Sequence, residues 1–274
     1  MRASWMMNLG KLFGAIAMTF ILSSCQSQAI TGKPPKILLP LYIYPNWYEG
    51  DNYAWSKVVE AAAKVPIVAI INPNNGPDGK PPNKDYQKGL EDLRKSDATI
   101  LGYVYTQYGD RPKAEVIQDI ILYARHYNLD GIFLDETASN ARQVEYYQDI
   151  YNYIKQNTYL KQVIVNPGTS ADERYLSKPA TDTAVVFENY PQPWEEYQLP
   201  PYSNSYKPER FAGLIHSVPD SDSMKKYINL AMTRNMGYIY VTDDSPKSDD
   251  GDPWNSLPSY WQEEVDYIES LMQK

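Results

Sequence analysis

The sequence predicts a single-domain α/β protein, a (β/α)8 or TIM barrel, preceded by a lipoprotein signal peptide. Short apolar runs alternate with segments of helical periodicity, which is the pattern of βα units around a parallel sheet. Eight such runs occur within roughly 240 residues, the length of one barrel. No Gly-x-Gly-x-x-Gly turn is present, so an open, doubly wound sheet is the less favoured alternative.

Each predicted strand is a short apolar run, and most of these runs are followed by a helix-spaced apolar stripe. The predicted strands are Ile37–Tyr44, Ile67–Ile71, Ile100–Tyr105, Gly131–Asp135, Gln162–Asn166, Ala184–Glu188, Phe211–His216 and Gly237–Thr242. Helical stripes include Trp55, Val58, Val59 and Ala62 early in the chain, and Trp261, Val265 and Ile268 at its end. After the fifth and sixth strands the stripes are poor, and repeated prolines favour loop over helix.

The N-terminal segment is predicted to be an export signal rather than part of the barrel. A positively charged start precedes an apolar run over residues 12–22 that is short for a membrane span. The run ends in Leu22-Ser23-Ser24-Cys25, which resembles a bacterial lipobox. We therefore expect a signal peptide over 1–24, a lipidated Cys25 with a linker over 25–36, and the barrel over 37–274. A plain signal peptide with an incidental cysteine is the alternative.

Composition narrows the partners of the chain. A formal charge of −8 and a pI near 4.9 argue against nucleic acid, which needs clustered lysine and arginine. One cysteine and two histidines are too few for a zinc or haem centre, so no cofactor and no metal are expected. The 25 tyrosines against 5 phenylalanines supply rings with an apolar face and a polar edge, which suit sugars. We expect a monomer, tethered to a membrane through Cys25, that acts on a polysaccharide.

The active site of such a barrel lies where the strands end. Acids, amides and aromatic residues occupy these positions, and Arg111 is almost the only fixed positive charge among them, so a phosphosugar is disfavoured. The candidate substrate-binding residues are Tyr42, Tyr44, Asn72, Tyr105, Tyr108, Asn166, Tyr190, Trp194, His216 and Asp243. For His216, ligand contact and simple packing stay equally open.

Three acids near strand ends, Asp135, Glu136 and Glu188, are the candidate catalytic residues. Hydrolysis of an acetal needs one carboxylic acid to protonate the leaving oxygen and a second carboxylate to attack or to activate water. The fourth and sixth strands lie about 10 Å apart, so their terminal carboxyls meet at ~5 to 9 Å, which leaves retaining and inverting geometries open. The sequence thus predicts a glycoside hydrolase.

Four ordered motifs resemble the spherulin-4-like family, which contains the family 135 glycoside hydrolases. They are Leu41-Tyr42-Ile43-Tyr44-Pro45, Ile71-Asn72-Pro73-Asn74-Asn75-Gly76-Pro77, Leu101-Gly102-Tyr103-Val104-Tyr105-Thr106 with Tyr108-Gly109, and Asp130-Gly131-Ile132-Phe133-Leu134-Asp135-Glu136. The resemblance implies a (β/α)8 barrel that cleaves internal bonds of α-1,4-linked N-acetylgalactosamine polymers, such as galactosaminogalactan. It also implies Asp135, Glu136 and Glu188 as the catalytic acids.

We assign Asp135 as nucleophile or base, Glu188 as general acid/base with a raised pKa, and Glu136 as support, the two glutamates being interchangeable. The pattern differs from the D-G-x-D-x-D-x-E strand of chitinase-like barrels, because Phe133 and Thr137 replace two of its acids. We further expect Tyr44, Tyr105, Tyr108, Tyr190 and Trp194 to line a groove for a polymer. A carbohydrate-binding envelope lipoprotein without turnover is the alternative function, and a metal-dependent deacetylase is a third, disfavoured by the lack of paired histidines.

Overall fold

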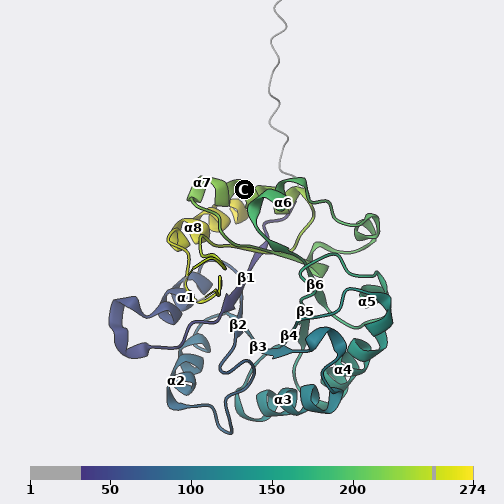
Figure 1. Cartoon of the computed structure of the whole chain (residues 1–274). Helices are drawn as coiled ribbons and strands as arrows, with labels where there is room; N and C mark the ends of the chain where they lie inside the picture. Colours follow the sequence, from purple (N-terminus) through teal and green to yellow (C-terminus); the bar gives the residue numbers. More distant parts are fainter. Residues whose placement is uncertain (1–31, 249–250, 274) are drawn as a thin grey trace, which may run out of the picture.

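The computed structural model describes residues 32–248 and 251–273, which form a closed ring of eight parallel strands surrounded by helices (Figure 1). The strands follow one another in chain order, and β8 pairs with β1 to close the ring. The predicted barrel is therefore confirmed. The strands are β1 (Lys36–Leu41), β2 (Ile67–Ile71), β3 (Thr99–Tyr105), β4 (Gly131–Asp135), β5 (Gln162–Val165), β6 (Thr183–Asn189), β7 (Phe211–Ile215) and β8 (Tyr238–Val241).

Helices lie outside the ring, between successive strands (Figure 1). They are α1 (Ala54–Ala62), α2 (Lys84–Leu93), α3 (Lys113–His126), α4 (Val144–Asn157), α5 (Arg174–Ser177), α6 (Pro191–Glu196), α7 (Ser221–Thr233) and α8 (Trp261–Met272). Short 3-10 segments add η1 (Trp47–Asn52), η2 (Gln107–Gly109), η3 (Ala141–Gln143), η4 (Pro201–Ser205) and η5 (Pro208–Arg210). The segments expected to be loop contain the short helices α5 and α6, the second starting at Pro191, where a helix tolerates proline.

The strands are apolar because both of their faces are covered. All five residues of β2 and of β7 are buried, as is typical of parallel strands between a packed interior and a layer of helices. The helices contribute one apolar stripe each, such as Trp55 and Val58 of α1. Within the part of the chain that the structure describes, no helix is long and apolar enough to span a bilayer. The predicted signal peptide and Cys25 lie outside the described residues.

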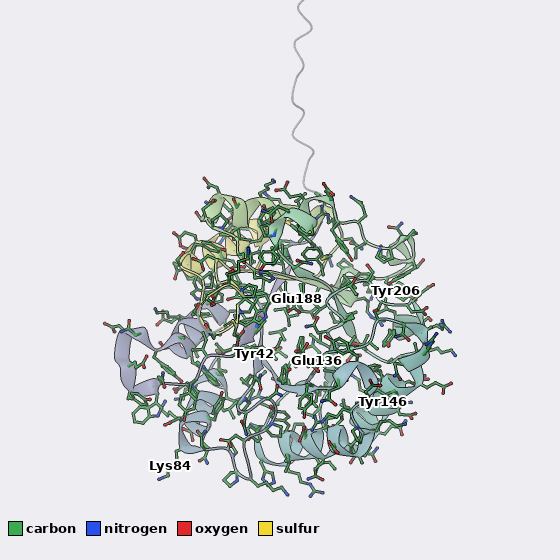
Figure 2. All side chains as sticks on the ribbon, in the orientation of Figure 1. Tyr42, Lys84, Glu136, Tyr146, Glu188 and Tyr206 are labelled. Atoms are coloured by element: carbon green, nitrogen blue, oxygen red, sulfur yellow. The ribbon has the colours of Figure 1, made fainter. Side chains whose placement is uncertain are left out.

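The first strand ends earlier than predicted, at Leu41 rather than Tyr44. The carbonyl of Ile43 accepts a hydrogen bond of 2.9 Å from the indole N–H of Trp55 instead of continuing the ladder. Residues 42–44 therefore belong to the mouth of the barrel. Tyr42, Glu136 and Glu188 are found within the ring, whereas Lys84, Tyr146 and Tyr206 lie around its outside (Figure 2).

Candidate active site

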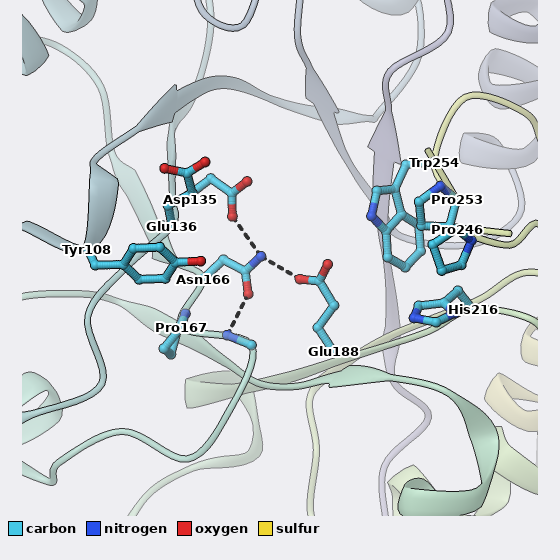
Figure 3. A pocket seen from close by; sticks show the side chains of 11 residues that line it. Tyr108, Asp135, Glu136, Asn166, Pro167, Glu188, His216, Pro246, Pro253 and Trp254 are labelled. Carbon is cyan, nitrogen blue, oxygen red and sulfur yellow. Dashed lines mark hydrogen bonds between the residues drawn. The ribbon is translucent and has the colours of Figure 1, made fainter. Parts of the chain in front are cut away.

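A cavity of about 370 Å³ opens where the strands end, and carboxyl groups line it (Figure 3). Asp135 and Glu136 come from the end of β4, Asn166 follows β5, and Glu188 lies near the end of β6. The cavity is lined by Tyr108, Asp135, Glu136, Asn166, Pro167, Gly168, Glu188, His216, Pro246, Pro253 and Trp254. The structure thus brings the three predicted acids together with three of the predicted binding residues.

One amide nitrogen joins the two buried carboxyl groups of this cavity. Nδ2 of Asn166 donates to Oδ1 of Asp135 at 2.8 Å and to Oε2 of Glu188 at 2.6 Å (Figure 3). Because both oxygens contact the same nitrogen, they are no more than about 5.4 Å apart. Oδ1 of Asn166 accepts from the backbone N–H of Gly168 at 2.9 Å, which fixes the amide with its NH2 group toward the acids.

The two carboxyl groups differ in the ease with which they ionise. Burial, followed by the charge of Asp135, raises the pKa of Glu188 to about 7, against the opposing effect of hydrogen bonds from Asn166 and Trp254. Burial also raises the pKa of Asp135, but the backbone N–H of Glu136 and the side chains of Tyr103 and Asn166 oppose that shift. Asp135 therefore has more groups that stabilise its ionised form. Near neutral pH, Glu188 is the member of the pair that carries the proton.

Backbone hydrogen bonds hold the ends of β3, β4 and β5 in register beyond the strands themselves. The N–H of Thr106 donates to Asp135 O at 3.0 Å, and the N–H of Asn166 donates to Leu134 O at 2.8 Å. The buried hydroxyl of Thr106 reaches the carbonyls of Asp135 at 2.9 Å and Glu136 at 2.8 Å. The end of β4 is consequently held from both sides, at Asp135 O by the β3 end and at Leu134 O by the β5 end.

Glu136 and Tyr108 adopt left-handed backbone conformations, with φ of 48° and 55°. Such conformations are costly for residues other than glycine and cluster at functional sites. The N–H of Tyr108 donates to Glu136 O at 2.6 Å, so the two strained residues support one another. Asp135 and Glu136 both line the cavity although they are sequence neighbours, because the turn at Glu136 interrupts the alternation of the strand. Tyr108 is 62% exposed and its ring borders the cavity.

Glu188 is positioned by an irregularity in β6. The register between β6 and β7 shifts between Val185 and Phe187, which is a β-bulge. Beyond the bulge, Phe187 is buried against Trp194 on the helix side, and Glu188 lies in the cavity. Its N–H donates to Gly168 O at 3.0 Å, so the β5–α5 loop supports Glu188 from the neighbouring strand. Gly168 has a φ of 62°, which favours glycine at this contact.

The far wall of the cavity comes from the segment between β8 and α8. Pro246, Pro253 and Trp254 line the cavity, and Trp254 packs against His216 with ring centroids 6.0 Å apart. Tyr103, also missed as a site residue, hydrogen-bonds with Asp135 from inside the barrel. A signal for Tyr103 existed in its place on β3, two residues before the strand end, whereas no local signal marks Trp254.

The prediction that Trp194 binds substrate is wrong. Its side chain is fully buried between α6 and α7, where Nε1 donates to Tyr227 O at 3.4 Å and Arg234 lies over the ring. The groove expected from Tyr44, Tyr105, Tyr108, Tyr190 and Trp194 loses this residue and otherwise stays a prediction. Of its five residues, only Tyr108 lines the cavity.

The remaining predicted binding residues lie near the cavity or hold the loops around it. Tyr42 packs edge-on against Tyr103 with centroids 5.5 Å apart, and burial and the charge of Asp135 raise its pKa. Tyr190 packs edge-on against His216 at 4.4 Å. The others have structural contacts: Tyr44 donates to Asp85 at 2.7 Å, Tyr105 lies under Arg111 at 4.0 Å, Asn72 accepts from Gly76 N–H at 3.0 Å, and Asp243 accepts from Ser259 N–H at 3.2 Å.

Among residues 32–248 and 251–273, no group of three histidine, cysteine, aspartate or glutamate side chains is arranged to hold a metal ion. The carboxyl groups that line the cavity can transfer protons and act as nucleophiles. A closed (β/α)8 barrel with a buried, hydrogen-bonded carboxyl pair at its strand ends belongs to the class of carbohydrate-active TIM-barrel proteins.

Comparison with known sequences identifies the family. Residues 36–268 match the model of spherulation-specific family 4, and the chain belongs to this family. It is 35% identical over 254 residues to Spherulin-4 of Physarum polycephalum, an alignment that covers 89% of this chain and 73% of Spherulin-4.

Two solved structures share the fold. Sph3 of Aspergillus clavatus, crystallised in complex with GalNAc, has a TM-score of 0.72 and 26% identity, covering 88% of this chain and 99% of Sph3. The spore cortex-lytic enzyme SleL of Bacillus cereus has a TM-score of 0.55 and 10% identity, covering 87% of this chain and 75% of SleL. The likeness to SleL shows the barrel fold alone.

The shared amide leads to a test of the site that does not depend on turnover. Asn166→Ala removes the donor that stabilises the ionised forms of Asp135 and Glu188, so we expect the pKa of both carboxyls to rise, Glu188 above about 7. Carboxyl ¹³C NMR titration of the wild type and the variant measures this directly. Unchanged titration of both groups would show that the bridge has no electrostatic role.

Proposed function

We propose that the chain is a glycoside hydrolase that cleaves an amino-sugar polysaccharide, acting within chains of α-1,4-linked N-acetylgalactosamine. The observation that carries the proposal is the carboxyl pair Asp135 and Glu188, close together in one cavity and unequal in acidity. Membership of spherulation-specific family 4 and the likeness to Sph3, a protein crystallised with GalNAc, support the choice of sugar.

In this mechanism, Glu188 protonates the glycosidic oxygen while Asp135 attacks the anomeric carbon. Retaining glycosidases place their two carboxyls about 5 to 5.5 Å apart, whereas inverting enzymes leave roughly 6.5 to 9.5 Å for a water molecule. The limit of about 5.4 Å between the two bridged oxygens supports the retaining route. Ionised Glu188 then takes a proton from the water that releases the sugar from Asp135.

A protein nucleophile also suits the linkage. In an α-linked galactosaminide the acetamido group lies on the same side of the ring as the leaving oxygen, so it cannot attack from the opposite face. A carboxylate of the protein has to do so. Glu136 borders the same cavity and has no hydrogen-bond partner for its carboxylate among the described residues, which leaves it available to sugar hydroxyl groups.

The charge of the cavity supports a neutral or cationic sugar. Three carboxyl groups line it, and no lysine or arginine does so among the described residues. An anionic sugar would meet like charge with no compensating cation. Incubating the chain from residue 26 onward, which lacks Cys25 and the residues before it, with a panel of amino-sugar polymers tests the proposal. Release of reducing ends distinguishes a hydrolase from a sugar-binding barrel without turnover, and long oligosaccharide products distinguish internal from terminal cleavage.

The division of roles predicts the effect of isosteric substitutions. Asp135→Asn removes the nucleophile and Glu188→Gln removes the acid, so each should lower kcat by about 10²-fold or more while polymer binding survives. Glu136→Gln should have a smaller effect, because that residue neither attacks nor protonates. The measurement is kcat and polymer affinity for all three variants. Near-normal turnover in both Asp135→Asn and Glu188→Gln would place the chemistry on other residues.

The raised pKa values of Glu188 and Asp135 predict a bell-shaped dependence of kcat/KM on pH. Activity should fall as pH rises through about 7, because Glu188 then loses the proton that it must donate. It should fall on the acidic side as Asp135 becomes protonated, at a pH above the usual range of an aspartate because burial raises its pKa. The pH profile of the wild type with its best polymer provides the measurement.

The pH dependence of thermal unfolding reports the raised pKa of Glu188 without a measurement of activity. Between about 4.5 and about 7 the folded chain keeps a proton on Glu188 that the unfolded chain releases, so this group makes stability fall with rising pH over that window. Glu188→Gln should therefore unfold at a higher temperature than the wild type above pH 7. Near pH 4.5 the two unfolding temperatures should be the same. An equal difference at both pH values would contradict the assignment of the raised pKa to Glu188.

We further propose that the chain is exported and held at a membrane by a lipid on Cys25. The supporting observation is the lipobox-like Leu22-Ser23-Ser24-Cys25 after the apolar run of residues 12–22. Cys25→Ser should yield soluble or uncleaved protein, whereas the wild type should fractionate with membranes and incorporate labelled fatty acid. A fully processed Cys25→Ser chain in the membrane fraction would count against the lipid anchor.

A further inference from the structure

Charges are segregated between the two ends of the barrel. All eight strands are parallel, so the segments that precede them share one end, and the segments that follow them share the other. In the preceding segments, with the first residue of β1 included, lysine and arginine outnumber acids by ten to four. In the following segments, with Asp135 and Glu188 included, acids outnumber lysine and arginine by thirteen to four among the described residues. We call these the strand-start end and the strand-finish end.

The cations of the strand-start end that have no ion-pair partner among the described residues lie just before neighbouring strands. Lys161, Lys178 and Lys207 precede β5, β6 and β7, are exposed, and form no ion pair with the described residues. Arg210 and Arg234 donate to backbone carbonyls, so no carboxylate neutralises their charge. Among the described residues, no ion pair therefore offsets the charge of these five cations, whereas Lys64, Arg94 and Lys95 are paired.

Apolar groups accompany these cations. Tyr159 is 51% exposed two residues before Lys161, and Met272 is 49% exposed at the end of α8. Met272 borders a cavity of about 290 Å³ that is lined by Lys33 and Lys36 and by four prolines. Lysine beside exposed tyrosine and apolar groups is a composition suited to the interface between lipid headgroups and water.

We propose that the strand-start end docks on a membrane surface that carries anionic phospholipid, with the acidic mouth of the cavity turned away from it. The net charge of −8 would repel such a surface, so only this end can approach it. The chain also enters the barrel here, through Lys33 and Lys36. If Cys25 carries a lipid, the eleven residues to Lys36 reach at most about 40 Å, which keeps this end near the membrane.

The charge argument is tested without the lipid anchor. The soluble chain from residue 26 contains every core residue, since the core begins at Ile37. It is sedimented with vesicles of phosphatidylcholine alone and with vesicles containing about one third phosphatidylglycerol, at low and at physiological salt. We expect binding only to the anionic vesicles, weakened by salt. Equal binding to both kinds of vesicle, or to neither, overturns the proposal.

A matched pair of variants separates position from net charge. Lys161→Glu with Lys178→Glu and Lys207→Glu should lower partitioning onto anionic vesicles by at least about tenfold. Lys80→Glu with Lys84→Glu and Arg142→Glu changes the net charge equally at the other end and should leave it within about twofold of the wild type. Circular dichroism confirms that both variants fold. Equal losses in the two variants, or tighter binding of the wild type to heparin than to anionic vesicles, would refute the assignment to lipid. Polymer hydrolysis in solution does not enter these readouts, so the hydrolase proposal stands or fails separately.

Discussion

The mouth of the barrel depends on a single hydrogen-bond donor group shared between two buried carboxyls. Two carboxylates at this separation repel each other, and burial makes each of them costly to ionise. The amide of Asn166 offsets part of that cost for both groups, and one bound proton on Glu188 removes most of the repulsion. The placement of β5 between β4 and β6 has this consequence, because it puts the amide where both acids can reach it. Gly168 then fixes which way the amide faces.

The barrel was predictable because its constraint is repeated in every unit. A parallel strand covered on both faces has to be apolar, so each strand is visible as a run in the sequence. The acids were predictable for a related reason, since a charged residue directly after such a run can only lie at the strand end. The residue at which a strand ends was harder to predict from the sequence. The end of β1 depends on the indole of Trp55, a contact across twelve residues that no local pattern contains.

The surroundings of the acids were poorly predicted because neighbours in sequence were taken as neighbours in space. Trp194 is six residues from Glu188, yet α6 turns its ring into the layer of helices. Trp254 is far from Glu188 in sequence and lies beside it in the fold. The high tyrosine content was also misleading, because it suggested sugar-binding surfaces. Many of them tie loops to the barrel through their hydroxyls, as Tyr146 does with Arg111 O at 2.7 Å and Tyr260 with Val218 O at 3.0 Å.

The bulge in β6 has a consequence for the proton donor, because it decides which way Glu188 faces. A strand alternates its side chains, so one residue more or less before position 188 exchanges the inward and outward sets. If β6 kept its present length and paired regularly with β7, Glu188 would lie opposite Ile215 instead of Leu214, and its carboxyl would face the helices while the ring of strands could still close. A sixth strand of the same length without the bulge would thus keep the barrel and lose the proton donor from the cavity. The single unpaired residue in β6 therefore decides on which side of the strand the carboxyl lies.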